Sequence, residues 1–246
     1  MKLHGLSKLT LLDFPGHLAC TAFTGACNFR CPYCHNAPLV LAPHTCPTIP
    51  EEEFFDFLAS RKGKLDGVCI TGGEPTLQAD LPSFIKKIKD MGLLVKLDTN
   101  GYHPDILKSL LEAQLLDMVA MDIKNDPENY ALTAGLDPAS FEPERLEKSI
   151  SLLLLSGIPH EFRTTLTKEH HTVENVKNIG IWLSGIAGRT FGTSALPSPY
   201  FLQNFKDSGN LVCGSDTSFH ALEDAELADF VSVLLTYIPN TKIRGQ

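Results

Sequence analysis

The sequence predicts an α/β fold, and more narrowly an incomplete (β/α)6 barrel. Short runs rich in β-branched residues alternate with longer helical segments, the order expected of β/α units around a parallel sheet. We count six such units. A full eight-unit barrel takes about 250 residues, and this chain of 246 residues leaves its first 16 and many loop residues outside the units. We therefore expect a single domain over residues 1–246, with an N-terminal extension at 1–16 and a partial barrel at 17–246.

Composition places the elements in order along the chain. A first strand, His17–Phe23, leads directly into a loop with three cysteines. The following helix, Pro50–Arg61, opens with Pro50 and three glutamates, which suits the positive end of the helix dipole. The next strand, Gly67–Thr71, ends in two glycines. The remaining helices and strands alternate in this order: Leu81–Met91, Leu93–Leu97, Pro104–Gln114, Met118–Ile123, Glu144–Leu155, Glu161–Leu166, Val173–Leu183, Tyr200–Phe205 and Leu222–Leu235.

Polar side chains follow the second to fifth predicted strands at the point where each strand ends. Any one of them could be a helix cap or a solvated loop charge. In a parallel β/α barrel, however, the carboxyl ends of the strands form the catalytic rim, so the set as a whole favours a site there. Its members are Glu74, Asp98, Thr99, Asn100, Asp122, Lys124 and the segment Arg163–Thr165.

A cysteine triplet stands out in the loop after the first strand. Cys27, Cys31 and Cys34 have the spacing C-x3-C-x2-C, and the aromatic Tyr33 comes just before the last cysteine. Three thiolates this close together can bind three irons of a [4Fe-4S] cube and leave the fourth iron without a protein ligand. An open iron indicates chemistry rather than simple electron storage.

The triplet has two alternatives to a cluster. The thiols could form a zinc site completed by His35, Cys46 or another group, or they could bind nothing. Structural zinc sites usually come as two pairs of ligands, and this chain has no second C-x2-C. A disulfide framework is disfavoured because 7 cysteines in 246 residues is an odd and sparse count. The spacing therefore favours the cluster.

Composition limits the class of protein. Hydrophobic residues make up 43% and charged residues 20% of the chain, ordinary values for a globular domain. We find no apolar run of about 18 residues that could span a bilayer and no signal-peptide cleavage site, so we expect a cytoplasmic protein without a membrane partner. The 21 Lys and Arg against 29 Asp and Glu give a net charge of −8. With no basic stripe, this balance disfavours nucleic-acid binding.

The segment Thr71-Gly72-Gly73-Glu74-Pro75 joins the cysteine triplet as a second motif. Two glycines at a strand end let the backbone approach a ligand closely, because no Cβ intervenes. With the triplet, this GGEP element resembles the radical S-adenosylmethionine (radical SAM) enzymes. The resemblance implies that SAM chelates the open iron, that the GGEP backbone and Glu74 meet the SAM amino group, and that Tyr33 lies near the adenine.

The later strand ends are similar to those of the glycyl-radical-enzyme activases. That resemblance implies that Asp98, Thr99 and Asp122 lie at the SAM site, where the two aspartates help hold a monovalent cation against the SAM carboxylate. It also implies that Lys124 and Arg163 lie beside SAM.

Two further elements narrow the resemblance to the activating proteins of anaerobic (class III) ribonucleoside-triphosphate reductase. These are Thr10–Gly16, with the sequence TLLDFPG, and Phe201–Phe205, with the sequence FLQNF. The resemblance implies an enzyme whose deoxyadenosyl radical abstracts a glycine hydrogen from the reductase, with a flavodoxin- or ferredoxin-type electron donor. The alternatives are another glycyl radical enzyme, a small-molecule substrate, or a non-enzymatic zinc-binding module.

The remaining polar features are expected to have smaller roles. The pair His170-His171 predicts a solvated turn, and the stretch from Gly185 to Pro199 predicts a loop. Asn36 has no role that the residues reveal. Of the four remaining cysteines, Cys20 and Cys69 are expected to be buried in strands. Cys46 and Cys213 are expected to lie in loops.

Overall fold

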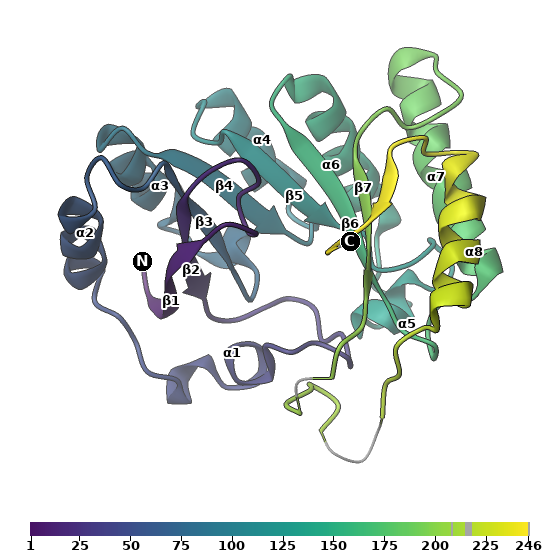
Figure 1. Cartoon of the computed structure of the whole chain (residues 1–246), viewed down its shortest axis with the longest axis horizontal. Coiled ribbons are helices and arrows are strands. Elements are labelled where there is room, and N and C mark those ends of the chain that lie inside the picture. The colour runs from purple at the N-terminus through teal and green to yellow at the C-terminus, as the bar shows by residue number, and fades with distance from the viewer. Residues whose placement is uncertain (208, 215–217, 246) are drawn as a thin grey trace. The chain divides into compact units, whose positions relative to one another are not determined.

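The computed structural model describes residues 1–207, 209–214 and 218–245, with helices and strands that alternate along the chain (Figure 1). The chain divides into two compact units. The first comprises Met1–Asn28, Asn36–Asn100 and Asp105–Ala120. The second comprises Phe29–His35, Gly101–Pro104 and Met121–Gln246. The boundary therefore cuts the cysteine loop, and each unit is described by itself.

The first unit contains an open sheet. Strand β1 is antiparallel to β2, whereas β2, β3 and β4 are parallel to one another. The register runs from Ala19 opposite Gly67 to Thr24 opposite Gly72. The strands are β1 (Leu3–Thr10), β2 (Ala19–Thr24), β3 (Gly67–Gly72) and β4 (Leu94–Thr99). The helices are α1 (Ala37–Leu41), α2 (Glu51–Ser60), α3 (Leu81–Asp90) and α4 (Pro104–Glu112), the last of which begins at the boundary.

Apolar side chains on one face of each helix build the core of this unit. In α3 the buried residues recur at helical spacing, at Leu81, Phe84, Ile85 and Ile88. The ring of Phe84 stacks on that of Phe54 from α2, with 5.3 Å between their centroids. This packing holds α2 and α3 together within the unit.

The strands of the second unit are also parallel to one another. Strand β6 pairs with β7, and β7 pairs with β8. The strands are β6 (His160–Leu166), β7 (Tyr200–Asn204) and β8 (Thr241–Ile243). The helices are α5 (Tyr130–Ala134), α6 (Pro143–Ser156), α7 (Val173–Phe191) and α8 (Asp224–Leu235). Strand β5 (Met118–Asp122) runs across the boundary between the units.

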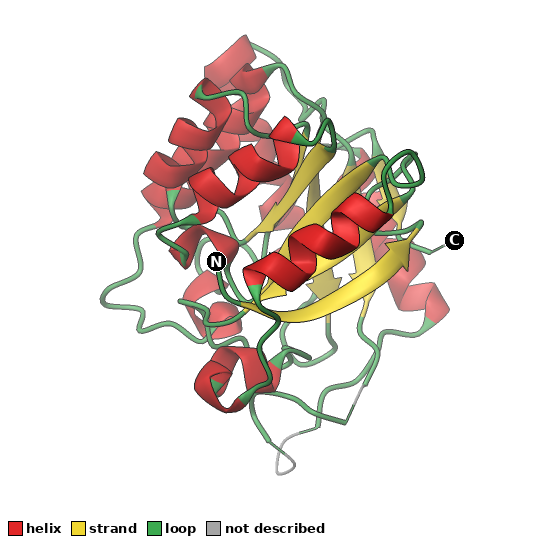
Figure 2. Cartoon of the chain, turned by 90° about the vertical axis from the view of Figure 1, so that its left-hand side faces the viewer, coloured by secondary structure: helices red, strands yellow, loops and turns green. Residues whose placement is uncertain are grey.

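The predicted fold class is confirmed, since helices alternate with strands along the chain and the strands are mainly parallel. Figure 2 shows the helices and the strands in separate colours. Most predicted elements are found within a few residues of their expected ends. The predicted loop from Gly185 to Pro199 is wrong in its first part, because α7 continues to Phe191 and ends at Gly192, whose φ is +72°. The single-domain prediction stays a prediction.

Four short or irregular elements are absent from the sequence prediction: β1, α1, α5 and β8. Strand β1 lies inside the expected N-terminal extension, and its pairing shifts register twice, between Leu3 and Gly5 and between Ser7 and Thr10. Such irregularities break the alternation of side chains that reveals a strand. The other three elements have at most five residues, too few to show a period.

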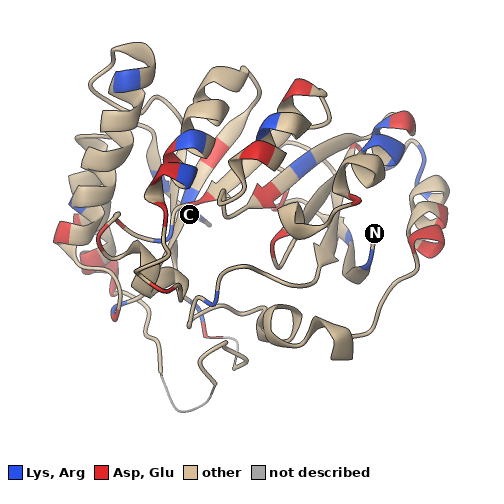
Figure 3. Ribbon diagram, turned by 180° about the vertical axis from the view of Figure 1, so that it is seen from behind, with Lys and Arg blue, Asp and Glu red and all other residues tan. Residues whose placement is uncertain are grey.

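Charges are mixed along both units. Figure 3 shows basic and acidic positions interspersed on the helices and strands, without a continuous basic stripe on the ribbon drawn in colour. No helix within residues 1–207, 209–214 and 218–245 has the length and hydropathy needed to cross a membrane. The cytoplasmic location stays a prediction.

Candidate active site

The buried carboxylate of Glu74 joins the ends of β3 and β4 in the first unit. Glu74 is only 1% exposed. Its Oε1 accepts hydrogen bonds from the backbone N (3.0 Å) and hydroxyl (2.5 Å) of Thr76 and from the hydroxyl of Thr99 (2.7 Å). Its Oε2 accepts from the backbone N of Asn100 at 2.7 Å. Burial raises the pKa of Glu74, although these hydrogen bonds oppose the change. Glu74 therefore fixes the geometry of the two strand ends.

The two glycines before Glu74 allow a very close approach to the segment that enters the cysteine loop. Gly72 has a φ of +112°, and a Cβ there would lie 2.4 Å from the carbonyl oxygen of Thr24. A Cβ on Gly73 would lie 1.9 Å from the carbonyl oxygen of Ala26. The backbone N of Gly73 donates to Thr24 (2.9 Å), and that of Glu74 donates to Ala26 (2.8 Å). The close approach is thus to the protein's own backbone, and the SAM contact stays a prediction.

Asn36 is tied to the same turn. Its Nδ2 donates to the carbonyl oxygen of Gly72 at 2.8 Å. Local sequence patterns do not indicate this contact, because the two residues are 36 apart in the chain and meet only in the folded structure. Asn36 thereby fixes the exit of the cysteine loop to the turn after β3.

A pair of asparagine amides lies at Cys27. The Nδ2 atom of Asn100 donates to the Oδ1 of Asn28 at 2.8 Å and lies 4.0 Å from the Sγ of Cys27. Asn100 is 6% exposed. The Nδ2 of Asn28 is buried and has no hydrogen-bond partner within the described part of the chain. The sequence pattern assigns neither asparagine a contact with the cysteines.

Asp98 carries its own counter-ion. The ammonium of Lys96, a residue with no exposed surface, pairs with the Asp98 carboxylate. The two residues are two apart on β4 and therefore point to the same face. The monovalent cation predicted for Asp98 and Asp122 stays a prediction.

In the second unit, the predicted residues Asp122, Lys124 and Arg163 form one charged cluster. The Nε and Nη2 atoms of Arg163 both lie 2.9 Å from one carboxylate oxygen of Asp122, and the Nζ of Lys124 lies 3.0 Å from the other. Burial raises the pKa of Asp122, but the two cations more than offset this and hold it below its usual range. Burial also lowers the pKa of Lys124, and the Asp122 charge overcomes that effect. One negative and two positive charges leave a net charge of +1, which suits an anionic ligand group.

Three polar atoms of the second unit are buried without a hydrogen-bond partner among the residues that the structure describes: the Tyr33 hydroxyl, Thr167 Oγ1 and His170 Nε2. The rings of Tyr33 and His170 lie 5.9 Å apart, and each also contacts the ring of Phe219. Buried polar groups are normally hydrogen-bonded. These three atoms therefore depart from the usual pairing of buried polar groups, and the adenine contact of Tyr33 stays a prediction.

The expected solvated turn at His170-His171 is wrong for His171. This residue is 3% exposed, accepts a hydrogen bond at Nδ1 from the backbone N of Thr167 (3.2 Å), and donates from Nε2 to the carbonyl oxygen of Lys124 (2.9 Å). Burial lowers the pKa of His171 to about 4, so the ring is neutral at pH 7. His171 thereby fixes the backbone of Lys124. The double-histidine pattern alone could not separate a buried bridge from an exposed turn.

The part of the cysteine loop in the second unit is tightly turned. The backbone N of Cys34 donates to the carbonyl oxygen of Cys31 at 3.0 Å. Segment 212–213 lies on this loop, since Val212 donates to Cys34 (3.2 Å) and Cys213 donates to Pro32 (3.0 Å). The residues that the structure describes contain no preformed group of three or more His, Cys, Asp or Glu side chains arranged for a metal ion. The ligand set Cys27, Cys31 and Cys34 stays a prediction.

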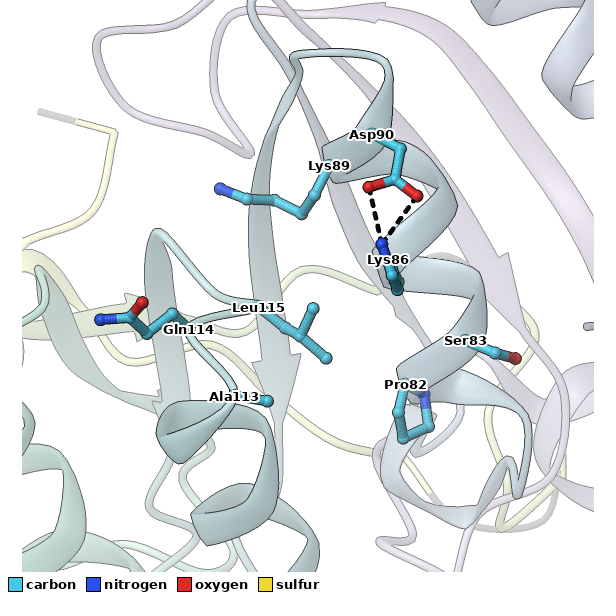
Figure 4. Close-up of a pocket in the computed structure, with 8 residues that line it drawn as sticks. All are labelled: Pro82, Ser83, Lys86, Lys89, Asp90, Ala113, Gln114 and Leu115. Atoms are coloured by element: carbon cyan, nitrogen blue, oxygen red, sulfur yellow. Dashed lines mark hydrogen bonds and ion pairs between the residues drawn. The ribbon is translucent and has the colours of Figure 1, made fainter.

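A pocket of about 430 Å³ in the first unit is lined by other residues than those of the predicted site. It is lined by residues of α3 and of the segment between α4 and β5, including the Lys86–Asp90 ion pair (2.8 Å) (Figure 4). Loops that lead from a helix into a strand lie at the amino ends of parallel strands, whereas catalytic groups gather at the carboxyl ends. None of the predicted site residues lines this pocket.

Comparison with protein families decides the class of protein. The sequence model of the radical SAM superfamily matches residues 21–177, well over half of the chain. The chain belongs to the radical SAM superfamily.

Two curated relatives of this radical SAM protein differ in function. A provisionally named glycyl-radical enzyme activating enzyme of Methanocaldococcus jannaschii is 33% identical over 180 residues, which cover 71% of this chain and 72% of that protein. A GTP 3',8-cyclase of Nautilia profundicola is 41% identical over 98 residues, but these cover only 37% of this chain and 30% of the cyclase.

Solved structures show the same fold at low identity. A radical SAM methyltransferase from Sphaerobacter thermophilus superposes with a TM-score of 0.70 at 13% identity, covering 94% of this chain and 67% of that one. Streptococcus suis SuiB bound to S-adenosylmethionine gives a TM-score of 0.64 at 15% identity, covering 90% of this chain and 49% of SuiB.

Membership implies an enzyme that uses a [4Fe-4S] cluster and SAM. The residues present fit both groups. The loop offers three thiols, the donors that iron–sulfur clusters require, and the cluster of Asp122, Lys124 and Arg163 offers a net positive charge for a carboxylate. The unpaired hydroxyl of Tyr33 offers a hydrogen bond to a base.

Proposed function

We propose that this radical SAM enzyme generates a glycyl radical on anaerobic ribonucleoside-triphosphate reductase. The observation that carries the proposal is the relative from M. jannaschii, whose name describes glycyl-radical activation and which the chain matches over 72% of its length. The elements Thr10–Gly16 and Phe201–Phe205 support the reductase as the partner within that class. A flavodoxin- or ferredoxin-type protein would deliver the electron.

In this proposal Cys27, Cys31 and Cys34 hold the cluster. When bound, the cluster would supply the one electron that cleaves SAM to methionine and a 5'-deoxyadenosyl radical, and this radical would take the α-hydrogen of a glycine to give 5'-deoxyadenosine. The protein needs no general base, because a hydrogen atom rather than a proton is transferred. Its task is to hold SAM and the glycine in near-attack geometry.

Further residues would bind and orient SAM. Lys124 and Arg163 would bind its carboxylate, because each presents donors in a cluster with net positive charge. Asp122 would hold these two cations in place and limit the excess charge.

The turn after β3, Gly72–Glu74, would face the amino group of SAM, while Glu74 acts mainly by fixing Thr99 and the start of the loop after β4. Tyr33 would lie at the adenine. A monovalent cation between Asp98, Asp122 and the SAM carboxylate belongs to the same proposal.

Electron paramagnetic resonance tests the proposal. The anaerobically reconstituted, reduced protein is mixed with SAM and the class III reductase from the same organism. We expect a glycyl-radical doublet that requires SAM and is lost in Cys31→Ala. Formation of 5'-deoxyadenosine without the doublet would reject the reductase as substrate.

A second candidate is a radical SAM enzyme that acts on a small molecule. The 41% identity to a GTP 3',8-cyclase favours it, although the match spans only 30% of the cyclase. Incubation with GTP, SAM and reductant, followed by mass spectrometry, separates the two, since only this candidate predicts a modified nucleotide. The non-enzymatic zinc module is set aside by the family match.

A further inference from the structure

Asn100 is held rigidly at the end of β4. Its backbone N donates to the Oε2 of Glu74 at 2.7 Å, and Glu74 is itself held by three further hydrogen bonds from Thr76 and Thr99. Both Glu74 and Asn100 are buried. The hydrogen bond to Glu74 therefore fixes the backbone of Asn100 independently of the Asn100 side chain.

The side chain of Asn100 has a fixed direction as well. Its Nδ2 donates to Asn28 Oδ1 at 2.8 Å and lies 4.0 Å from the Sγ of Cys27. A primary amide carries two N–H donors, so the same nitrogen can donate to Asn28 and to the sulfur at once. A distance of 4.0 Å is long for a neutral thiol, but hydrogen bonds shorten when the acceptor carries a charge.

The neighbouring amide of Asn28 points to the same chemistry. Its Nδ2 is buried next to Cys27 in sequence and has no partner in the described ranges. The described residues around Cys27 thus offer an N–H donor that none of their own acceptors uses. A buried donor of this kind fits a site that receives negative charge, because an unmade hydrogen bond otherwise costs about 1–3 kcal/mol.

We propose that Asn100 is a positioning residue of the cluster: its side-chain amide, oriented by Asn28, donates a hydrogen bond to the Cys27 thiolate and makes the cluster easier to reduce. The inference rests on the proposed function, in which Cys27 is a ligand. One electron from an external low-potential reductant enters the oxidised cluster, whose net charge becomes more negative by one. Donors aimed at a ligand sulfur stabilise that reduced form, and such hydrogen bonds set the potential of iron–sulfur proteins. The amide transfers no proton and forms no covalent bond.

The test is the midpoint potential of the reconstituted full-length protein, measured by an anaerobic redox titration with electron paramagnetic resonance. Asn100→Leu keeps the volume and removes both donors, and Asn100→Asp keeps the shape but replaces the donors with a carboxylate. For Asn100→Leu we expect the ratio of reduced to oxidised cluster at a fixed potential to fall about tenfold. This fall corresponds to a midpoint potential lower by about 59 mV for a one-electron couple. Asn100→Asp should shift the potential further in the same direction.

Two additional variants keep the test decisive. Asn240→Asp adds a charge at an exposed asparagine whose side chain donates to the carbonyl of Pro197, and it should leave the potential unchanged. Asn28→Ala removes both the acceptor that orients Asn100 and the unpartnered Asn28 donor, so it should also lower the potential.

The outcomes separate this inference from the proposed function. Unchanged potentials at wild-type iron and sulfide content in the Asn100 variants would overturn the role of Asn100 and leave the function intact. If both Asn100 variants bind no cluster, the proposed tuning role is overturned, because the Asn100 side chain is then needed to assemble the site rather than to set its potential. Failure of the wild-type protein to bind any cluster would overturn the proposed function instead.

Discussion

Gly73 leaves very little room for a side chain, because its missing Cβ would lie 1.9 Å from the Ala26 carbonyl oxygen. We expect Gly73→Ala to lower the free energy of unfolding by about 2–4 kcal/mol, since the backbone must move to remove the overlap. Urea unfolding monitored by circular dichroism measures this. The control is Gly185→Ala in helix α7, where the nearest atom lies 3.9 Å away and alanine should stabilise by about 0.5–1 kcal/mol. Similar effects of both substitutions would contradict the prediction.

Arg163 supplies one of the two cations beside Asp122. Arg163→Leu changes the net charge of that cluster from +1 to 0, so the affinity for the SAM carboxylate should fall at least about tenfold, which is about 1.4 kcal/mol. Anaerobic equilibrium dialysis with labelled SAM measures the dissociation constant. Arg189→Leu is the matched control, because Arg189 pairs with Glu147 on an exposed surface. Unchanged affinity in Arg163→Leu would show that this cluster does not hold SAM.

His171 should make stability depend on pH. Its pKa falls from 6.5 to about 4 on folding because of burial. Between pH 6.5 and about pH 4, His171 is protonated in the unfolded chain but neutral in the folded protein. The free energy of unfolding therefore falls as the pH decreases. From about pH 6.5 to about pH 5 the loss should reach roughly 2 kcal/mol. Urea unfolding as a function of pH should show this slope in the wild type and in the exposed control His44→Gln, but a clearly smaller slope in His171→Gln.

The cysteines and the GGEP element could be predicted because their chemistry follows from residue type and spacing within a few positions. The contacts of Asn28, Asn100 and His171 could not be predicted, because only the fold creates them. Asn100 illustrates the reason. It meets Asn28 from 72 residues away, and nothing in the local sequence distinguishes its amide from that of a loop asparagine. The strand-end rule placed Asn100 at the rim but did not reveal its contact with Asn28.

At the level of elements, helix α7 has a well-defined start. Thr172 accepts at its hydroxyl from the backbone N of Asn175 (3.2 Å), and the Asn175 side chain accepts from the backbone N of Thr172 (3.0 Å). Thr172→Ala should therefore lower the free energy of unfolding by about 1 kcal/mol. Thermal unfolding compared with Thr236→Ala, at the exposed end of α8, measures the difference. Equal melting temperatures for the two variants would contradict the role of the cap.

Helices and strands could be predicted where the spacing of hydrophobic residues and the length of the segment both indicated the same kind of element. Helix α3 shows both, since its buried residues follow the helical repeat over ten residues. The predicted helix corresponding to α7 is too short because Gly185 and Gly188 are typical of loops, although buried Ile186 and Ala187 continue its apolar face. Tertiary packing therefore outweighed the low helix propensity of glycine.

For the molecule as a whole, the cysteine loop should decide whether SAM is cleaved. Cys27→Ala removes one of three proposed ligands, so formation of 5'-deoxyadenosine from SAM and dithionite should fall below detection. Cys46→Ala should retain nearly normal cleavage, because the Cys46 thiol contacts the carbonyl oxygen of Ala42 (3.8 Å) within its own short turn. Product is measured by chromatography after anaerobic reconstitution. Loss of the cluster in Cys46→Ala would show that the ligands are misassigned.

The contact between Gly73 and Ala26 also limits how this protein can be re-engineered. The backbone of the turn after β3 packs directly against the backbone before Cys27, and two hydrogen bonds join them. Neither segment can therefore move to accommodate a different neighbouring segment. A graft of the cysteine loop onto another scaffold would have to carry Gly72–Glu74 with it. The two motifs therefore form one structural block, although helices α1 and α2 and most of strand β3 lie between them in the chain.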